Sequence, residues 1–276
     1  MAWWGKLLGG TFGFMMGGPL GAILGAALGH GFDKGLDSAA DVEVLQPGER
    51  ERIQTAFFTA TFSVLGHISK ADGRVSEHEI GLARNLMDEM DLTPEMRQTA
   101  IRLFDEGKTQ GFPLDEVLEQ FRGECHRRQT LIQMFLEIQL QGAYADGRMD
   151  PAEERLLRHM AGQLGFSEPA FRRLERMVWA ERQFAGAGAG TGEQWRRRPA
   201  PEPAGPSLED AYAVLNVPSE AGDAEVKKAY RRLISQHHPD KLVSKGLPEE
   251  MMRLATRKTH EIKQAYEAVK KARGMR

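Results

Sequence analysis

The stretch Asp223-Ala-Glu-Val-Lys-Lys-Ala-Tyr-Arg-Arg-Leu-Ile-Ser-Gln-His-His-Pro-Asp240 decides the fold of the C-terminal part of the chain. Its inward-facing residues recur at helical spacing, at positions Val226, Ala229, Tyr230 and Leu233. Proline fixes its own φ angle and disfavours helical geometry in the residue before it, so the helix ends at the tripeptide His238-Pro239-Asp240. A second helical pattern follows and ends in Ile262-Lys-Gln-Ala-Tyr-Glu-Ala-Val269. We therefore predict two antiparallel helices joined by a His-Pro-Asp loop.

The outer side of the first of these helices is purely basic, with Lys227, Lys228, Arg231 and Arg232. Like charges four residues apart on a helix oppose its stability by a few tenths of a kcal/mol (about 0.2–0.5) per pair. A merely solvated helix face usually mixes charges of both signs, which is the alternative interpretation of this stripe. The absence of carboxylates here indicates an acidic partner surface, which such charges would steer and orient more than they would tighten its binding.

A short helical segment at residues 208–215 precedes this hairpin, and the whole of residues 207–276 resembles the J domain of the DnaJ (Hsp40) co-chaperones. The resemblance implies docking on a DnaK-type Hsp70 and acceleration of ATP hydrolysis by that partner, an allosteric effect. It assigns the contacts to His238, Pro239, Asp240, Lys227, Lys228, Arg231 and Arg232. The sequence shows no nucleotide-binding loop, nucleophile triad or zinc motif, so we predict a regulator of a partner ATPase, with no cofactor and no catalytic residue of its own.

The N-terminal segment has the properties of a membrane span. No charged residue occurs over the 23 positions of residues 7–29. As a helix this stretch is about 34 Å long, enough for a hydrocarbon core of about 30 Å. Trp3 and Trp4, in a short N-terminus of residues 1–6, suit the headgroup level. A secretory signal would have a shorter apolar stretch and a cleavage site, and an interfacial helix would have a polar face.

Glycine recurs at every fourth position of this segment, at Gly9, Gly13, Gly17, Gly21, Gly25 and Gly29. In lipid, small residues at this spacing let two helix backbones approach closely. We therefore predict self-association of the transmembrane helix and a homodimer. The flanking Lys6 and Lys34 do not orient the span.

Residues 50–184 show helical patterns throughout and contain an internal repeat. Lys70-Ala-Asp-Gly-Arg74 aligns with Tyr144-Ala-Asp-Gly-Arg148 at an offset of 74 residues, and a helix-start signal follows each turn. We predict about seven helices in two halves related by a pseudo-twofold. The paired turns resemble the TerB (tellurite-resistance B) domain, which is all-helical.

The acidic residues of the two turns have two possible roles. In TerB-like domains such turns have been linked to metal binding, and carboxylates from two facing turns could hold Ca²⁺. The candidate ligands would be Asp72, Glu79, Asp146, Asp150 and Glu153. Their spacing is not that of an EF-hand, however, and the same residue types cap helices and form tight turns. We therefore expect capping and predict no metal site.

Two segments read as connections, the juxtamembrane residues 30–49 and the linker of residues 185–206. The linker begins with alternating glycine and alanine and continues rich in proline and arginine, a composition that tethers but builds no core. The single cysteine, Cys125, excludes an intramolecular disulfide and fits a reducing compartment. A net charge of −2 argues against nucleic-acid binding.

The order of span, bundle, linker and J domain resembles the bacterial membrane-anchored DnaJ-like co-chaperones with a TerB-like middle domain. The resemblance implies an all-α, single-pass inner-membrane protein with its short N-terminus in the periplasm and the bulk of the chain in the cytoplasm. Its partners would be a DnaK-type Hsp70, membrane lipid and a second copy of the chain. The alternative is a membrane scaffold or metal-responsive sensor whose bundle binds the signal and whose J domain only recruits the chaperone.

Overall fold

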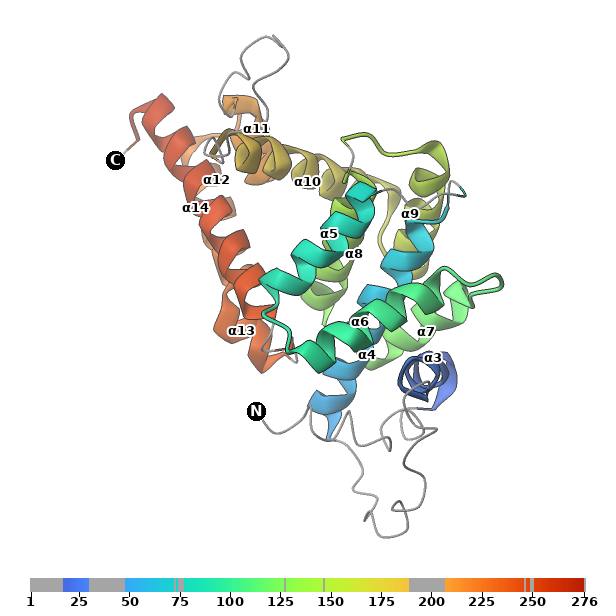
Figure 1. Cartoon of the computed structure of the whole chain (residues 1–276). Helices are drawn as coiled ribbons and strands as arrows, with labels where there is room; N and C mark the ends of the chain where they lie inside the picture. Colours follow the sequence, from blue (N-terminus) through green and yellow to red (C-terminus); the bar gives the residue numbers. More distant parts are fainter. Residues whose placement is uncertain are drawn as a thin grey trace. The chain divides into compact units, whose positions relative to one another are not determined.

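The computed structural model describes residues 17–29, 48–71, 73, 77–126, 128–145, 147–188, 207–245, 247–248 and 251–275 (Figure 1). Its described secondary structure is entirely helical, which confirms the predicted all-α fold. The chain divides into two compact units. The first unit comprises residues 1–168 and 242–253, and the second comprises residues 169–241 and 254–276.

The first unit is built around one buried helix, α4 (Glu49–Ile68). The helices that accompany it are α3 (Gly18–Gly29), α5 (Glu77–Glu89), α6 (Pro94–Gly107), α7 (Leu114–Glu124), α8 (Gln129–Ala143) and α9 (Pro151–Gln163). Helix α10 (Glu168–Gly188) begins at the end of this unit and continues into the second. Among the described residues between 49 and 188 there are seven helices, the predicted number, although all of α10 except Glu168 belongs to the second unit.

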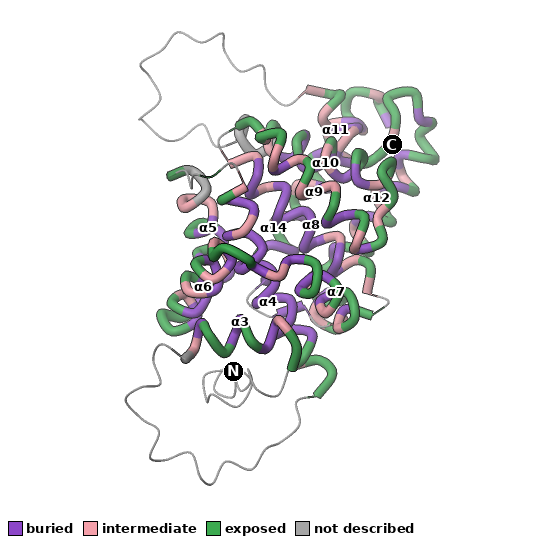
Figure 2. Tube along the Cα trace, turned by 90° about the vertical axis from the view of Figure 1, so that its right-hand side faces the viewer, coloured by how far each residue is buried: buried purple, intermediate pink, exposed green. Residues whose placement is uncertain are grey.

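Helix α4 is buried on every side, and Figure 2 shows α4 and α8 largely in purple. Two glycines allow α4 and α6 to touch backbone to backbone. A Cβ atom on Gly66 would lie 2.0 Å from the Phe104 carbonyl oxygen, and one on Gly107 would lie 1.8 Å from the Ser63 carbonyl oxygen. Because real Cβ atoms do not approach other atoms so closely, only glycine fits at this crossing.

The predicted repeat is visible in the backbone. Gly73 N–H donates to the Lys70 carbonyl and Gly147 N–H to the Tyr144 carbonyl, both at 2.9 Å, and both glycines have positive φ. The C-terminal turns of α5 and α9 also correspond at the offset of 74. Both use a residue of positive φ, Asp91 after α5 and Gly165 after α9. The two halves therefore share local geometry as well as sequence; their pseudo-twofold relation stays a prediction.

The expected membrane segment is described only from Gly17 on, as α3. This helix begins at Gly18. Gly17 and Gly18 both have positive φ, so the chain turns there before regular helical geometry starts. Pro19 lies in the first turn, where the N–H that it lacks would have no partner. Within the first unit, Leu20 and Leu24 are fully buried. Among the described residues, no helix is both long enough and apolar enough to cross a membrane.

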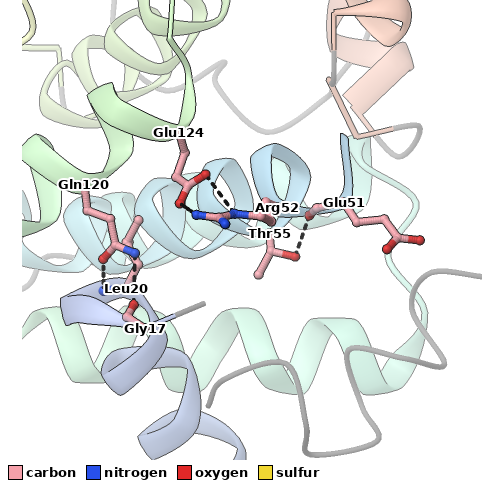
Figure 3. A network of polar contacts seen from close by, with 7 residues as sticks. All are labelled: Gly17, Leu20, Glu51, Arg52, Thr55, Gln120 and Glu124. Carbon is pink, nitrogen blue, oxygen red and sulfur yellow. Dashed lines mark hydrogen bonds and ion pairs between the residues drawn. The ribbon is translucent and has the colours of Figure 1, made fainter. Parts of the chain in front are cut away.

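Side chains of α6 and α7 hold α3 at both of its ends. Gln120 accepts a hydrogen bond from Leu20 N–H at 2.9 Å and donates one to the Gly17 carbonyl at 3.0 Å (Figure 3). Arg102 donates to the Ala27 carbonyl at 3.0 Å. The bonds to the Leu20 N–H and the Ala27 carbonyl satisfy backbone groups that a helix leaves unpaired at its termini.

An ion pair next to this contact joins α4 to α7. The guanidinium of Arg52 binds both carboxylate oxygens of Glu124, at 2.6 and 3.2 Å (Figure 3). This bidentate hydrogen bonding raises the pKa of Arg52.

The second unit contains the rest of α10, then α11 (Leu208–Val214), α12 (Asp223–His237) and most of α14 (Met252–Arg273). A single hydrophobic core joins them, made of Ala180, Ala211, Tyr212, Val214, Leu215, Ala221, Val226, Leu233, Ile262, Ala265, Val269 and Met275. The predicted inward positions of α12 are confirmed, since Val226, Ala229 and Leu233 are buried. Tyr230 is half-buried, and its ring stacks on that of Tyr266, with centroids 4.1 Å apart.

Arg273 connects the C-terminal end of α14 to the loop before α12 by hydrogen bonds. Arg273 donates to the Tyr212 hydroxyl and to the Ala221 and Ser219 carbonyls, each at 2.5 Å. It also pairs with Asp223 at 3.2 Å. The hydrogen bond that Arg273 donates to the Tyr212 hydroxyl is the main cause of the raised pKa of Arg273.

Candidate functional site

The His-Pro-Asp tripeptide forms a sharp corner rather than the predicted loop. His238 alone leaves helical geometry, with φ −62° and ψ 125°, and a short helix α13 (Pro239–Ser244) begins at the next residue. Proline is well suited to the first position of a helix, since the N–H that it lacks would have no partner there. The corner therefore consists of a single extended residue between two helices.

The corner presents two polar side chains to solvent. His238 and Asp240 are exposed, with 47% and 83% of their side chains accessible. The Asp240 N–H donates to Nδ1 of His238 at 3.3 Å, so this ring nitrogen is the acceptor. In the neutral ring the proton then lies on Nε2, which makes Nε2 a donor.

The residue before the corner fixes its position. His237 is buried, and its carbonyl accepts a hydrogen bond from the Thr259 hydroxyl of α14 at 3.1 Å. The stack of Tyr230 on Tyr266 joins the same two helices farther along. The exposed His238 therefore projects from a helix end whose position the packing against α14 determines.

The predicted basic stripe lies on the solvent side of α12. Lys228, Arg231 and Arg232 are exposed, and Lys227 is half-buried. Within the described part of the chain, Lys228, Arg231 and Arg232 form no ion pair. Three cations without carboxylate partners on one helix face are available to an acidic surface.

Lys241 is a basic residue near this corner that was not among the predicted contacts. Its ammonium group donates to the Ser235 hydroxyl of α12 at 2.6 Å, and the side chain is exposed. The charge therefore lies between the stripe and the corner. The signal available in the sequence was its place directly after the His-Pro-Asp tripeptide.

The other predicted site residues fall in different places. Among the glycines of the membrane segment, Gly9 and Gly13 lie outside the described residues, while Gly17, Gly21, Gly25 and Gly29 belong to α3 or its start. A Cβ atom on Gly17 or Gly25 would meet nothing within 4 Å, so these two leave an open surface on α3, whereas Gly21 is buried. Self-association through the stripe stays a prediction.

The acidic residues of the repeat are used for capping wherever they are described. Asp150 accepts from Ala152 N–H at 2.7 Å, and Glu153 accepts from Asp150 N–H at 2.9 Å, which is the predicted cap of α9. Asp72, Asp146 and the side chain of Glu79 lie outside the described residues. Elsewhere in the described part, no three His, Cys, Asp or Glu side chains form a group that could hold a metal ion.

The single cysteine is unsuited to chemistry. Cys125 is completely buried at the end of α7, and burial raises the pKa of its thiol to about 12. Since the thiolate is the reactive form, this side chain is inert near neutral pH.

Three family models match the chain in the predicted order. The Co-chaperone DjlA transmembrane domain matches residues 1–39, Tellurite resistance protein TerB matches residues 58–176, and the DnaJ domain matches residues 210–274. The first of these supports the predicted N-terminal membrane domain. No solved structure matches the chain significantly.

Curated relatives match over 100% of both chains. Co-chaperone protein DjlA of Escherichia coli (strain K12) is 43% identical over 281 residues, and that of Salmonella typhimurium (strain LT2) is 43% identical over 279 residues. The protein of the same name from Yersinia pseudotuberculosis is 44% identical over 284 residues. With this identity over the full length, and with the helical corner and basic stripe in place, the chain belongs to the DjlA family of membrane J-domain co-chaperones.

Proposed function

We propose that this chain binds a DnaK-type Hsp70 and stimulates ATP hydrolysis by that chaperone, without being an enzyme itself. The observation that carries the proposal is the combination of the exposed His238–Asp240 corner with the basic stripe on α12. Both lie on one helix and the turn that follows it, so a single partner surface can reach them together.

The two parts of this surface have different physical roles. The exposed lysine and arginine side chains of the stripe attract an acidic surface and orient it, which mainly affects the rate of association. The corner offers a histidine N–H donor and a carboxylate acceptor held by a packed helix end. Contacts that are stronger in one state of the partner than in another shift that partner toward the favoured state. Stimulation of hydrolysis therefore requires the corner, and the stripe sets the concentration at which it occurs.

The membrane segment gives the proposed activity its location. We propose that the short N-terminus is periplasmic and that the bundle and J domain lie in the cytoplasm, because the partner needs ATP. The apolar segment would contact lipid, and its glycine stripe would pair two copies of the chain. The match of residues 1–39 to a co-chaperone transmembrane domain supports the membrane location.

The test is single-turnover ATP hydrolysis by DnaK with the full chain in detergent micelles or nanodiscs. We expect stimulation by the wild type and its loss in His238→Gln. His260→Gln is the matched control, since His260 is an exposed histidine of α14 outside the corner. Equal stimulation by all three proteins, or none by the wild type, would contradict the proposal.

A further inference from the structure

Helix α10 brings two arginines next to the basic stripe of α12. Within the second unit, a pocket of about 430 Å³ is lined by residues of α10, the loop after α11 and the outer side of α12. Its polar lining comprises Arg173 and Arg176 from α10, Asn216 from the loop, and Glu225 and Arg232 from α12. All five side chains are exposed, so the pocket is open to a macromolecule.

The charge of this pocket is strongly positive. Three guanidinium groups face one carboxylate, and within the described residues none of the three arginines forms an ion pair. Arg173 and Arg176 use only Nε in hydrogen bonds, both long at 3.4 Å, to carbonyls of their own helix. Clustered guanidinium groups without anions repel one another, and their planar forks fit carboxylates in bidentate fashion. The pocket thus suits an acidic peptide segment.

Buried contacts hold α10 in this position. Ala180 belongs to the hydrophobic core that α11, α12 and α14 share. Next to it, Glu181 forms an ion pair with Lys258 of α14 at 2.5 Å, with only 3% and 8% of the two side chains exposed. A buried ion pair adds little net stability but penalises any arrangement that separates the charges. Arg176 lies four residues before Ala180, about 6 Å along the helix, so these contacts also fix the arginines.

We propose that α10 extends the chaperone-docking surface, with Arg173, Arg176 and Arg232 together binding an acidic segment of the partner Hsp70. The inference rests on the proposed function. Its basis is the position of Arg232, which belongs both to the stripe and to the pocket. The contact surface of the partner would thus continue from α12 onto a helix outside residues 210–274, the range of the DnaJ-domain match.

The test uses the full chain in nanodiscs and the double variant Arg173→Glu/Arg176→Glu. We expect the concentration for half-maximal stimulation of DnaK to rise about tenfold or more, with maximal stimulation unchanged, because charge reversal weakens encounter and binding. The neutral variant Arg173→Gln/Arg176→Gln should show a smaller rise in the same direction. Arg155→Glu is the matched control and should behave as the wild type, since Arg155 is an exposed arginine of α9 that does not line the pocket.

A second measurement removes the positioning contacts and keeps the arginines. In Glu181→Leu/Lys258→Met both buried charges are replaced by apolar side chains, so folding should be retained while the fixed register of α10 is relaxed. We expect a rise in the half-maximal concentration of about threefold, and a smaller additional effect of the arginine reversal in this background, since the two changes act on one feature. Thermal melting of each variant excludes unfolding as the cause.

The outcomes separate this inference from the proposed function. If the wild type does not stimulate DnaK, or if His238→Gln stimulates normally, the proposed function fails. If both behave as expected but the arginine reversal leaves the half-maximal concentration unchanged, only the extended surface is overturned. Stronger stimulation by the reversed variant would also overturn it, because α10 would then hinder access of the partner to α12. An unchanged half-maximal concentration with weaker binding to phosphatidylglycerol vesicles would assign the arginines to lipid instead.

Discussion

Helices α4 and α12 differ in how much of each helix is buried. Fifteen of the 20 residues of α4 are buried, whereas α12 buries four of its 15. In α4 the polar residues Thr55 and Ser63 donate their hydroxyl protons to carbonyls of their own helix, which allows them to be enclosed. In α12 three of the four cations of the basic stripe, Lys228, Arg231 and Arg232, are left in solvent. Changes in α4 should therefore affect stability, and changes on the outer side of α12 should affect activity.

The largest effect should come from the crossing of α4 with α6. In Gly66→Ala the added methyl group would lie within 2.0 Å of the Phe104 carbonyl oxygen, so the helices must separate. We expect a loss of about 3 kcal/mol in the free energy of unfolding. Chemical denaturation of the full chain in detergent measures it. The control is Gly162→Ala in α9, where a Cβ meets nothing within 4 Å and stability should rise slightly. Equal stability of the two variants would disprove the close crossing.

Removing one charge from the buried pair of the second unit should cost almost as much. In Lys258→Met, the ion pair of the buried Glu181 carboxylate with Lys258 is lost. Breaking such a pair costs about 3 kcal/mol, while replacing both charges by apolar groups is often nearly neutral. We therefore expect Lys258→Met to melt at a lower temperature than Glu181→Leu/Lys258→Met. The reverse order would show that the pair is accessible to water.

Much of this contrast could be predicted from the sequence. The period of 3.6 residues located the helices, and the cap at Asp150 gave the start of α9, because these signals depend on neighbouring residues alone. The inward and outward positions of α12 followed in the same way. The His238–Asp240 corner was located correctly by its tripeptide, although the helix that begins at Pro239 was not foreseen.

Features that depend on contacts distant in sequence could not be predicted. Glu181 and Lys258 are separated by 77 positions, and no spacing rule connects two charges on different helices. The pocket beside Arg232 has the same origin, since its walls come from three separate segments. The need for glycine at position 66 could not be predicted either, because it depends on the backbone of α6 that crosses α4 at this point.

On α12 itself, reversal of the stripe should have a moderate effect on activity and almost none on stability. For Lys228→Glu/Arg231→Glu we expect no fall in melting temperature, because both side chains are exposed and form no ion pair among the described residues. A small rise is expected, since the two like-charge pairs four residues apart become opposite-charge pairs. The association rate with DnaK should fall about tenfold at low salt and less at high salt, as electrostatic steering is screened. Stopped-flow binding at two salt concentrations measures both effects. A reduced rate that does not depend on salt would contradict steering.

The smallest expected effect is the pH dependence of stability that His67 causes. His67 lies in the last turn of α4, whereas the exposed His238 follows the last turn of α12. Its Nδ1 lies 3.2 Å from the Gly107 carbonyl oxygen, and its ring stacks on Phe112 with centroids 5.0 Å apart. Burial lowers the pKa of His67 below its ordinary value of 6.5, although the hydrogen bond to Gly107 opposes this. The unfolded chain therefore takes up a proton more readily than the folded chain. The stability that neutral His67 contributes is fully present above pH 6.5 and is lost as the pH falls toward the lower pKa of the folded state.

The difference between wild type and His67→Gln isolates this contribution from the titration of carboxylates, which both proteins share. We expect the wild type to lose more unfolding free energy than the variant between pH 7.5 and pH 5.5, by less than about 1 kcal/mol, because the ring is only partly buried. Denaturation midpoints measured across this range provide the comparison. Parallel curves for the two proteins would mean that solvent reaches His67 as freely as it reaches His238, and the contrast between α4 and α12 would then not extend to the last turn of α4.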